Sequence, residues 1–470
     1  MQPNYKVINA SAGSGKTYAL VQNLLTICLK YPSQADKIRN ILALTFTNKA
    51  ANEMKHRIID WLKKFSLETY ESNNDLINIQ EKLKNEGFNI PLKELHERSK
   101  KMLDYILHHY STLNIGTIDK FNAKLVRSFA QELGLAQNFN LEINAEPFLI
   151  EAVDKMLEDI GEENKISEAF MDFVNYTLDN NDRIDLNKTL YNSAKEYVQD
   201  KHYFQLNENK DFDWEVYEST KINLRKSIKD LREDSVKIAE GVMSLLKEKN
   251  LEIGDFADGQ NGIGGFFEKF LNKKIPLLYE TIEQEEGREE KIRKGASSKS
   301  KNKEADIFEI LDFLLQHRKK IISNHVEAEK KEKILNALLP LKVNKDIQDK
   351  LAEIEQENDL VLLSKFNIMI HENLREEPTA FIYEKIGTKF SHYFFDEFQD
   401  TSLLQWKNFL PLRDHAVSQE HMSFTLVGDP KQSIYRFRGG DSQLMLDIIN
   451  KKENSPVFAK LENLENNYRS

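Results

Sequence analysis

The sequence is poor in cysteine and has no long apolar run. Cys28 is the only cysteine among 470 residues, so no disulfide can form within the chain. It lies in an apolar stretch, which predicts a small core residue. No stretch approaches the roughly 18 consecutive apolar residues of a membrane-spanning helix, and the amino terminus lacks the residue order of a signal peptide. These absences exclude a disulfide-stabilised fold and predict a cytoplasmic protein.

An excess of positive charge is also absent. The 66 Lys and Arg residues are outnumbered by 76 Asp and Glu residues, which gives a formal net charge of −10. A negative total argues mildly against a polyanionic partner, but it does not exclude one, because nucleic-acid binding requires only a local basic groove. The length suggests roughly three domains of ordinary size.

A glycine-rich loop lies close to the amino terminus. Residues 10–17 read Ala-Ser-Ala-Gly-Ser-Gly-Lys-Thr, between a strand-like run that ends near Ile8 and a helix-like run. This is the phosphate-binding pattern G-x-x-x-x-G-K-[ST], with Ala10 at the first glycine. Lys16 is expected to reach the outer phosphates and the Thr17 hydroxyl to hold Mg²⁺. The predicted nucleotide-binding residues of the loop are Ala12, Gly13, Ser14, Gly15, Lys16 and Thr17. The alternative, a turn that binds nothing, does not explain the flanking strand and helix.

The first part of the chain, residues 1–134, alternates strand-like and helix-like runs. Strands are expected within 39–47 and 111–118, and a helix over 49–64. This rhythm is typical of a parallel sheet with crossover helices. Residues 65–110 are polar with a helical pattern and are interpreted as an insertion between strands.

The composition changes over residues 135–375, which are rich in Glu, Lys, Asn and Leu with a 3.6-residue period. This pattern predicts an all-helical domain. A glycine-rich break at 255–265 interrupts it, and a basic Ser/Gly stretch at 291–303 predicts a mobile loop. Residues 376–470 return to strand-like runs, at 390–395 and 423–427. The sequence therefore predicts an α/β fold, a parallel P-loop sheet flanked by helices, with a large helical insertion.

Two later blocks carry candidate chemistry. An apolar strand delivers Asp396 and Glu397 together at its carboxyl end, where one carboxylate can hold the Mg²⁺ of Mg-ATP and the other can polarise a water. The alternative is a solvated acidic turn. Gln432 follows the next strand and could sense a terminal phosphate. Tyr435 and Phe437 then alternate with arginines, a pattern suited to stacking on bases, although an ordinary half-buried segment has the same pattern.

Together these blocks resemble a known family. Residues 45–58, 116–121, 396–401, the Gln432 block and the terminal Asn-Tyr-Arg-Ser look like successive motifs of superfamily 1 DNA helicases of the UvrD/Rep type. Within this group the chain looks most similar to the RecB/AddA branch, the large helicase–nuclease subunits of DNA recombination and repair. Three features carry this resemblance: the loop at 10–17, the long segment between residues 58 and 111, and the run at 116–129. The resemblance covers the sheet-forming sequence and little of the helical block.

The resemblance implies a RecA-like domain and a role for each matching residue. The implied catalytic residues are Lys16, Glu397, Gln432 and Arg469, with Glu397 as the general base. Tyr468 would stack on adenine, and Thr17 and Asp396 would hold Mg²⁺. The implied DNA-binding residues are Thr45, Phe46, Asn48, Tyr435 and Phe437. The implied activity is ATP-dependent 3′ to 5′ movement on single-stranded DNA, and the implied protein partner is a second helicase–nuclease subunit.

Some positions depart from the family pattern. Only nine residues precede Ala10, which leaves no room for the glutamine motif that reads adenine in many relatives. Phe437 stands where many relatives have Trp, and Asp119 where His is common. The sequence ends at Ser470, before the family's second RecA-like domain and any nuclease domain. We therefore expect an amino-terminal motor half, and the alternative for this chain alone is a nucleotide- and DNA-binding module with little or no catalysis.

Overall fold

The computed structural model describes residues 4–11, 13, 15–32, 35–136, 138–162, 170–171, 186–199, 202–208, 211–272, 295–376, 386, 389–436, 439–453, 455 and 457–464. The chain divides into two compact units. One, called the sheet unit, comprises residues 1–153, 190–208 and 348–470, and the other, called the helical unit, comprises residues 154–189 and 209–347. Each is described separately below, and the domain boundaries expected from the sequence stay a prediction.

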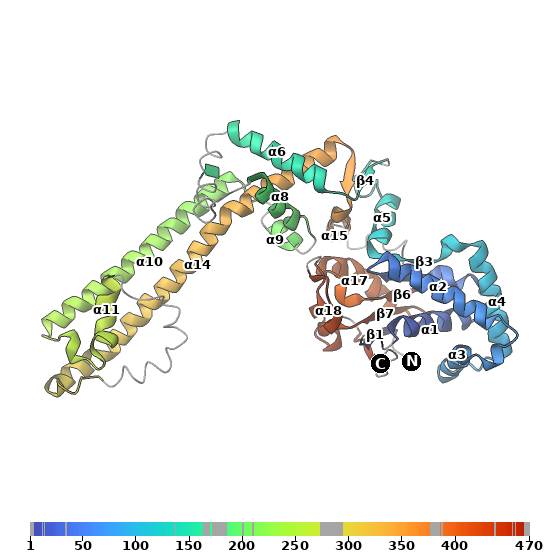
Figure 1. The fold of residues 1–470 in the computed structure, drawn as a ribbon, viewed down its shortest axis with the longest axis horizontal. Coiled ribbons are helices and arrows are strands. Elements are labelled where there is room, and N and C mark those ends of the chain that lie inside the picture. Colours follow the sequence, from blue (N-terminus) through green and yellow to red (C-terminus); the bar gives the residue numbers. More distant parts are fainter. Residues whose placement is uncertain are drawn as a thin grey trace. The chain divides into compact units, whose positions relative to one another are not determined.

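A six-stranded parallel sheet forms the centre of the sheet unit (Figure 1), in the order β3-β2-β6-β7-β1-β8. Its strands are β1 (Tyr5–Ala10), β2 (Ile41–Thr45), β3 (Asn114–Thr117), β6 (His392–Phe395), β7 (Ser423–Gly428) and β8 (Lys460–Leu464). The expected α/β fold is confirmed, since five of these strands lie where the sequence predicts them. The predicted second part of the sheet therefore inserts β6 and β7 between β2 and β1, far from their place in the sequence.

Helices cover both faces of this sheet. One face packs on α1 (Lys16–Leu29), α2 (Asn48–Phe65), α3 (Asn74–Asn85) and α4 (Leu92–His108), which share one buried apolar cluster. The other face packs on α5 (Ile118–Ser128), α15 (Phe366–Glu376), α17 (Leu403–Ser418) and α18 (Ser442–Ile449). Strand residues alternate between the two clusters, as a pleated strand requires: Ala43 and Phe394 belong to the first, and Leu44 and Phe395 to the second.

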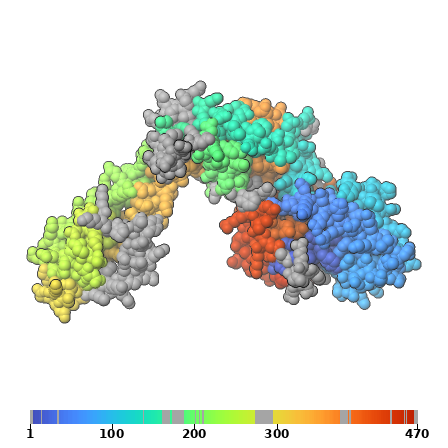
Figure 2. All heavy atoms as spheres, in the orientation of Figure 1, coloured from blue at the N-terminus to red at the C-terminus, as the bar shows by residue number. Residues whose placement is uncertain are grey.

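The polar insertion expected at 65–110 is helical, as α3 and α4, but it is not a solvated appendage. Leu76, Ile79 and Leu83 of α3 are fully buried, as are Leu95 and Ile106 of α4. These residues recur at helical spacing and join the cluster around α1. In Figure 2 the blue and cyan residues of this region form one continuous packed surface.

The block expected to be entirely helical, residues 135–375, also contains two short strands, and both belong to the sheet unit. Asn140–Glu142 (β4) and Leu360–Leu362 (β5) pair as a two-stranded parallel sheet. Three-residue strands are too short to show an alternating pattern, which explains why the sequence did not reveal them. Helices α6 (Glu146–Glu162), α8 (Leu186–Tyr197) and α9 (Tyr203–Glu208) follow β4 in the chain.

The helical unit is built on α10 (Trp214–Glu248), α11 (Ile263–Leu271) and α14 (Glu304–Glu357). Apolar residues from these three helices form one buried cluster, together with Leu251 and Phe256 of the segment between α10 and α11. The glycine-rich break allows tight backbone contact, because a Cβ on Gly265 would lie 2.2 Å from the Gln260 carbonyl oxygen. None of the described helices is both long enough and apolar enough to cross a membrane.

The basic stretch expected to be a mobile loop is only partly described, since residues 291–294 lie outside the described residues. Its second half is held by hydrogen bonds. Asp255 accepts from the Ser300 hydroxyl at 2.7 Å and pairs with Lys303 at 2.8 Å, and the backbone nitrogen of Ala257 donates to the Gly295 carbonyl at 2.8 Å. Hydrogen bonds from the Lys303 ammonium, the backbone nitrogen of Glu252 and the Ser300 hydroxyl lower the pKa of Asp255 to about 2. This half of the loop is therefore anchored to the glycine-rich break.

Candidate nucleotide and nucleic-acid site

The glycine-rich loop joins β1 to the first turn of α1. Gly13 and Gly15 have φ angles of 80° and 85°, in the left-handed region that side chains other than glycine seldom adopt. The residue at the N-cap of α1 is Gly15, which has no side chain to cap the helix, and the first turn holds no acidic residue. The N–H groups and the positive end of the helix dipole can therefore receive an anion such as a phosphate. Ala12 and Ser14 lie outside the described residues.

Lys16 connects three sequence blocks that are far apart in the chain. Its ammonium donates to the Glu397 carboxylate at 2.9 Å and to the Gln432 side-chain oxygen at 3.2 Å. The strand order explains this meeting, because β7 lies between β1 and β6, and the carboxyl ends of parallel strands share one edge of the sheet. Gln432, one of the two residues predicted to contact the γ-phosphate, and Glu397, the predicted general base, therefore lie around one lysine.

Glu397 is held in an unusual conformation. Its φ angle is 53°, a left-handed value that is costly for a residue with a side chain. The Gln399 side-chain nitrogen donates to the Glu397 carboxylate at 2.7 Å. The Gln399 side-chain oxygen accepts from the backbone nitrogen of Asp429 at 3.0 Å. Asp429 in turn accepts from the Gln432 amide at 2.5 Å. The sequence motifs did not single out Gln399 and Asp429, although both lie inside the blocks that resemble the family.

Asp396 lies beside Glu397 and is buried, with 6% of its surface exposed. Burial and the neighbouring Glu397 charge raise the pKa of Asp396 to about 7, and Lys16 partly offsets this rise. A divalent cation would favour the ionised form. Thr17 lies in the first turn of α1. Its hydroxyl oxygen and the Asp396 carboxylate are both oxygen ligands, the kind that Mg²⁺ prefers.

A metal site made by the protein alone is not present among the described residues, where no three His, Cys, Asp or Glu side chains gather. This agrees with the way in which Mg²⁺ binds in phosphoryl-transfer proteins, through one or two protein ligands and the phosphates of the substrate. Thr17 and Asp396 therefore fit a metal that arrives with a nucleotide.

Two predicted DNA-facing aromatic residues also meet. The rings of Phe46 and Tyr435 are half-buried, with centroids 4.5 Å apart and planes inclined by 34°. Asn48 is exposed at the start of α2, whereas Thr45 is fully buried at the end of β2. The remaining predicted residues, Phe437, Tyr468 and Arg469, lie outside the described residues, and so does Arg438.

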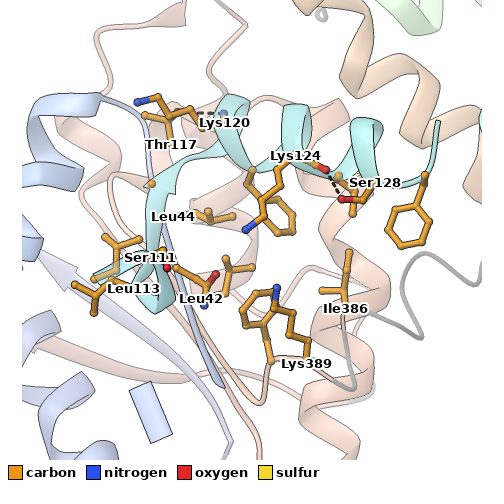
Figure 3. A pocket seen from close by; sticks show the side chains of 17 residues that line it. Leu42, Leu44, Ser111, Leu113, Thr117, Lys120, Lys124, Ser128, Ile386 and Lys389 are labelled. Carbon is orange, nitrogen blue, oxygen red and sulfur yellow. Dashed lines mark hydrogen bonds between the residues drawn. The ribbon is translucent and has the colours of Figure 1, made fainter. Parts of the chain in front are cut away.

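A separate cavity of about 440 Å³ lies on the other face of the sheet, beside β2, β3 and α5. Its floor is apolar, and Figure 3 shows Lys120, Lys124 and Lys389 around it. Among the described residues these three are the only charged ones that line it, and none has an ion pair with another described residue. Burial, Lys124 and Arg39 lower the pKa of Lys389. The cavity is a local concentration of positive charge in a negatively charged chain.

A parallel sheet with a glycine-rich phosphate loop is the fold of a P-loop nucleotide-binding protein. The family model for the UvrD/REP helicase N-terminal domain matches residues 3–453, so the chain belongs to this family. The family implies that the protein uses a nucleotide. The resemblance of the motifs to this family is confirmed.

The chain is similar to several helicase–nuclease subunits. It is 25% identical to an ATP-dependent helicase/nuclease subunit of Clostridium novyi (strain NT), over 99% of this chain and 36% of that protein. It is 27% identical to RecBCD enzyme subunit RecB of Buchnera aphidicola subsp. Acyrthosiphon pisum (strain APS), over 93% of this chain and 34% of that protein. The chain spans about a third of the length of these curated relatives.

Proposed function

We propose that this chain is the amino-terminal motor half of an ATP-dependent DNA helicase that acts in recombination or repair. The observation that carries the proposal is the junction of Lys16 with Glu397 and Gln432, at 2.9 and 3.2 Å. It unites the phosphate loop, the acidic strand end and the glutamine of the third block at one edge of the sheet. The intact protein would hydrolyse ATP and move 3′ to 5′ along single-stranded DNA.

Each residue of the junction has a role in this proposal. Lys16 binds the outer phosphates, Thr17 and Asp396 hold Mg²⁺, and Glu397 takes a proton from the attacking water. The metal, when bound, neutralises charge on the phosphate oxygens. Gln399 orients Glu397 through its 2.7 Å hydrogen bond. Gln432 and Arg469 are proposed to contact the γ-phosphate, and Tyr468 is proposed to stack on adenine.

The proposed path of the DNA passes over the aromatic pair Phe46 and Tyr435. Aromatic rings stack on bases without regard to sequence, which suits a motor that moves along any strand. Asn48 is exposed two residues after Phe46 and can contact the sugar-phosphate backbone. Phe437 is proposed to add a further stacking face. A second helicase–nuclease subunit is a proposed partner, because one relative is named as a subunit of the RecBCD enzyme.

A second candidate function is a nucleotide- and DNA-binding module with little catalysis of its own. It is favoured by the share of the relatives that the chain spans, about a third. P-loop enzymes often receive a transition-state arginine from another domain or protein, which is worth roughly 10³ to 10⁵ in rate. A P-loop domain that acts without such an arginine would bind ATP and hydrolyse it slowly.

An ATPase assay on residues 1–470, with and without single-stranded DNA, separates the two functions. Turnover that rises with DNA and that is abolished in Glu397→Gln would support the motor. Binding of Mg-ATP without turnover would support the module. Lys16→Ala is the control that should lose nucleotide binding in either case, and a wild-type chain that binds no ATP would contradict both functions.

A further inference from the structure

The hydroxyl of Thr45 is an unusual feature of the sheet. Thr45 is fully buried, and its Oγ1 has no hydrogen-bond partner among the described residues. A buried hydroxyl without a partner costs stability, because it has lost its hydrogen bonds to water. Valine has nearly the same shape and would avoid this cost. The fold alone therefore gives no reason for a threonine here.

Thr45 lies next to Asp396 at the ends of two adjacent strands. Strands β2 and β6 pair in parallel with Leu44 opposite Phe395, so that Thr45 and Asp396 are the next residues along. The backbone nitrogen of Asp396 donates to the Leu44 carbonyl at 2.8 Å, which continues the pairing to this point. Two neighbouring strands therefore end side by side in a hydroxyl and a carboxylate.

Strand alternation decides which face of the sheet these two side chains occupy. Ala43 and Phe394 pack in the cluster that contains α1. Because side chains alternate with a period of two, Thr45 and Asp396 are on the same face as these residues. This is the face covered by α1, whose first turn holds Lys16 and Thr17. The unpaired hydroxyl is thus beside the carboxylate of the phosphate-loop site.

We propose that Thr45 is a positioning residue of the magnesium–nucleotide site, which makes this inference rest on the proposed function. A threonine hydroxyl has one donor and two acceptor positions. Its proton can be donated to a carboxylate oxygen of Asp396, which would orient that carboxylate toward a metal. Groups that hold a metal ligand in orientation in this way commonly affect metal affinity.

This assignment differs from the role that the family resemblance implies for Thr45, which is a contact with DNA. A fully buried side chain has no surface to offer to DNA, whereas Asn48 and Phe46 have exposed or partly exposed surface. Thr45 therefore connects the end of β2, where the proposed DNA-facing residues begin, with the proposed metal ligand Asp396, which directly follows β6. The two sites share one strand end.

The test compares variants that differ only in the hydroxyl. Thr45→Val removes it at nearly constant volume, and Thr45→Ser keeps it. If the Thr45→Val variant does not fold, Thr45→Ala and Thr45→Ser give a second comparison without and with the hydroxyl. Affinity for the fluorescent nucleotide mant-ATP is measured with and without Mg²⁺, together with urea unfolding of the nucleotide-free protein. Thr425→Val, at a buried threonine of β7, is the matched control.

We expect Thr45→Val to lose about tenfold in Mg²⁺-dependent mant-ATP affinity, with unchanged affinity in the absence of Mg²⁺. The same variant should unfold at a higher urea concentration, because the unpaired hydroxyl is gone. Thr45→Ser and Thr425→Val should keep the Mg²⁺ dependence. In an Asp396→Asn background, Thr45→Val should have no further effect, since the two residues act as one unit.

Three results would overturn the inference. The first is a Thr45→Val variant that keeps the full effect of Mg²⁺, which would leave the hydroxyl without a part in the metal site. The second is a loss of affinity for a single-stranded oligonucleotide without nucleotide present, which would assign the hydroxyl to DNA. The third is a wild-type chain that binds no mant-ATP, which would reject the proposed function as well.

Discussion

At the scale of single residues, the junction around Lys16 depends on close packing next to it. Gly428 ends β7, and a Cβ at this position would lie 2.4 Å from the Gln399 side-chain oxygen and 3.0 Å from the Met445 sulfur. Gln399 is the residue that holds Glu397 and accepts from the backbone of Asp429. Position 428 therefore requires a glycine because the Gln399 side chain occupies the space that a Cβ would need, and not because of its backbone conformation.

Gly428→Ala should move the Gln399 amide and release Glu397. Overpacking of this kind costs about 1–3 kcal/mol of unfolding free energy, and we expect DNA-stimulated ATP turnover, or the Mg²⁺-dependent affinity for ATP if turnover is absent, to fall at a temperature where the variant is folded. Gly116→Ala is the control, because a Cβ on Gly116 meets no described atom within 4 Å. Equal behaviour of the two variants in urea unfolding and in nucleotide binding would contradict the prediction.

At the scale of elements, buried polar contacts join helices that follow different sequence blocks. Asn122 of α5 donates to the Asn367 side chain of α15 at 2.6 Å, and Asn408 of α17 donates to the Asn367 carbonyl at 2.7 Å. Helix α5 follows the third expected strand, and α17 follows the acidic block. These helices are thus fixed to one another on the face opposite to α1, which keeps the strand ends in register.

Most strands of the sheet were predictable because they are apolar and end in recognisable motifs. Strand β8 was not predicted, since Lys460 and Glu462 make its sequence polar, as befits an edge strand that pairs only with β1 among the described strands. Strands β4 and β5 were too short to be recognised. Within the site, the motifs predicted Lys16 and Glu397, but a single sequence contains no signal for a hydrogen bond such as that of Gln399 to the Asp429 backbone.

His392, the first residue of β6, makes the stability of the sheet depend on pH. It is buried and lies 2.9 Å from the Ser423 hydroxyl. Burial, with smaller effects of Lys37, His421 and Lys30, lowers the pKa of His392 to about 3, from an ordinary value of 6.5. Between these values the unfolded chain binds a proton that the folded chain does not. The free energy of unfolding therefore falls as pH falls below about 6.5, by up to about 1.4 kcal/mol per pH unit.

The comparison of wild type with His392→Gln by urea unfolding at pH 7.5 and 5 isolates this effect. Asp396 acts in the opposite direction, because its raised pKa makes the folded state the stronger proton acceptor. Asp396 is present in both proteins, so its effect is the same in each. Between pH 7.5 and 5 the free energy of unfolding should fall by about 2 kcal/mol more in the wild type than in the variant. Parallel pH dependence of the two proteins would mean that His392 is accessible to protons in the folded state.

At the scale of the whole molecule, positive charge is concentrated in one place although the net charge is negative. The formal net charge is −10, yet the only described charged residues that line the cavity beside α5 are Lys120, Lys124 and Lys389. Lys120 lies within the block that resembles a helicase motif. Burial lowers the pKa of Lys55 in α2, and the charge of Lys120 lowers it further. A negatively charged protein that binds DNA needs such a concentration of cations, because the total charge repels the ligand.

The double reversal Lys120→Glu/Lys124→Glu tests whether this local charge serves DNA binding. If both lysines contact phosphates, the affinity for single-stranded DNA should fall, and the salt dependence of the binding constant should weaken by a slope of about 1.4. Lys100→Glu/Lys101→Glu on α4 changes the net charge by the same amount at two exposed positions. If both double variants lose the same affinity, the total charge is what matters. A loss confined to the first variant, with the smaller salt slope, would extend the DNA path from the aromatic pair to the face of α5.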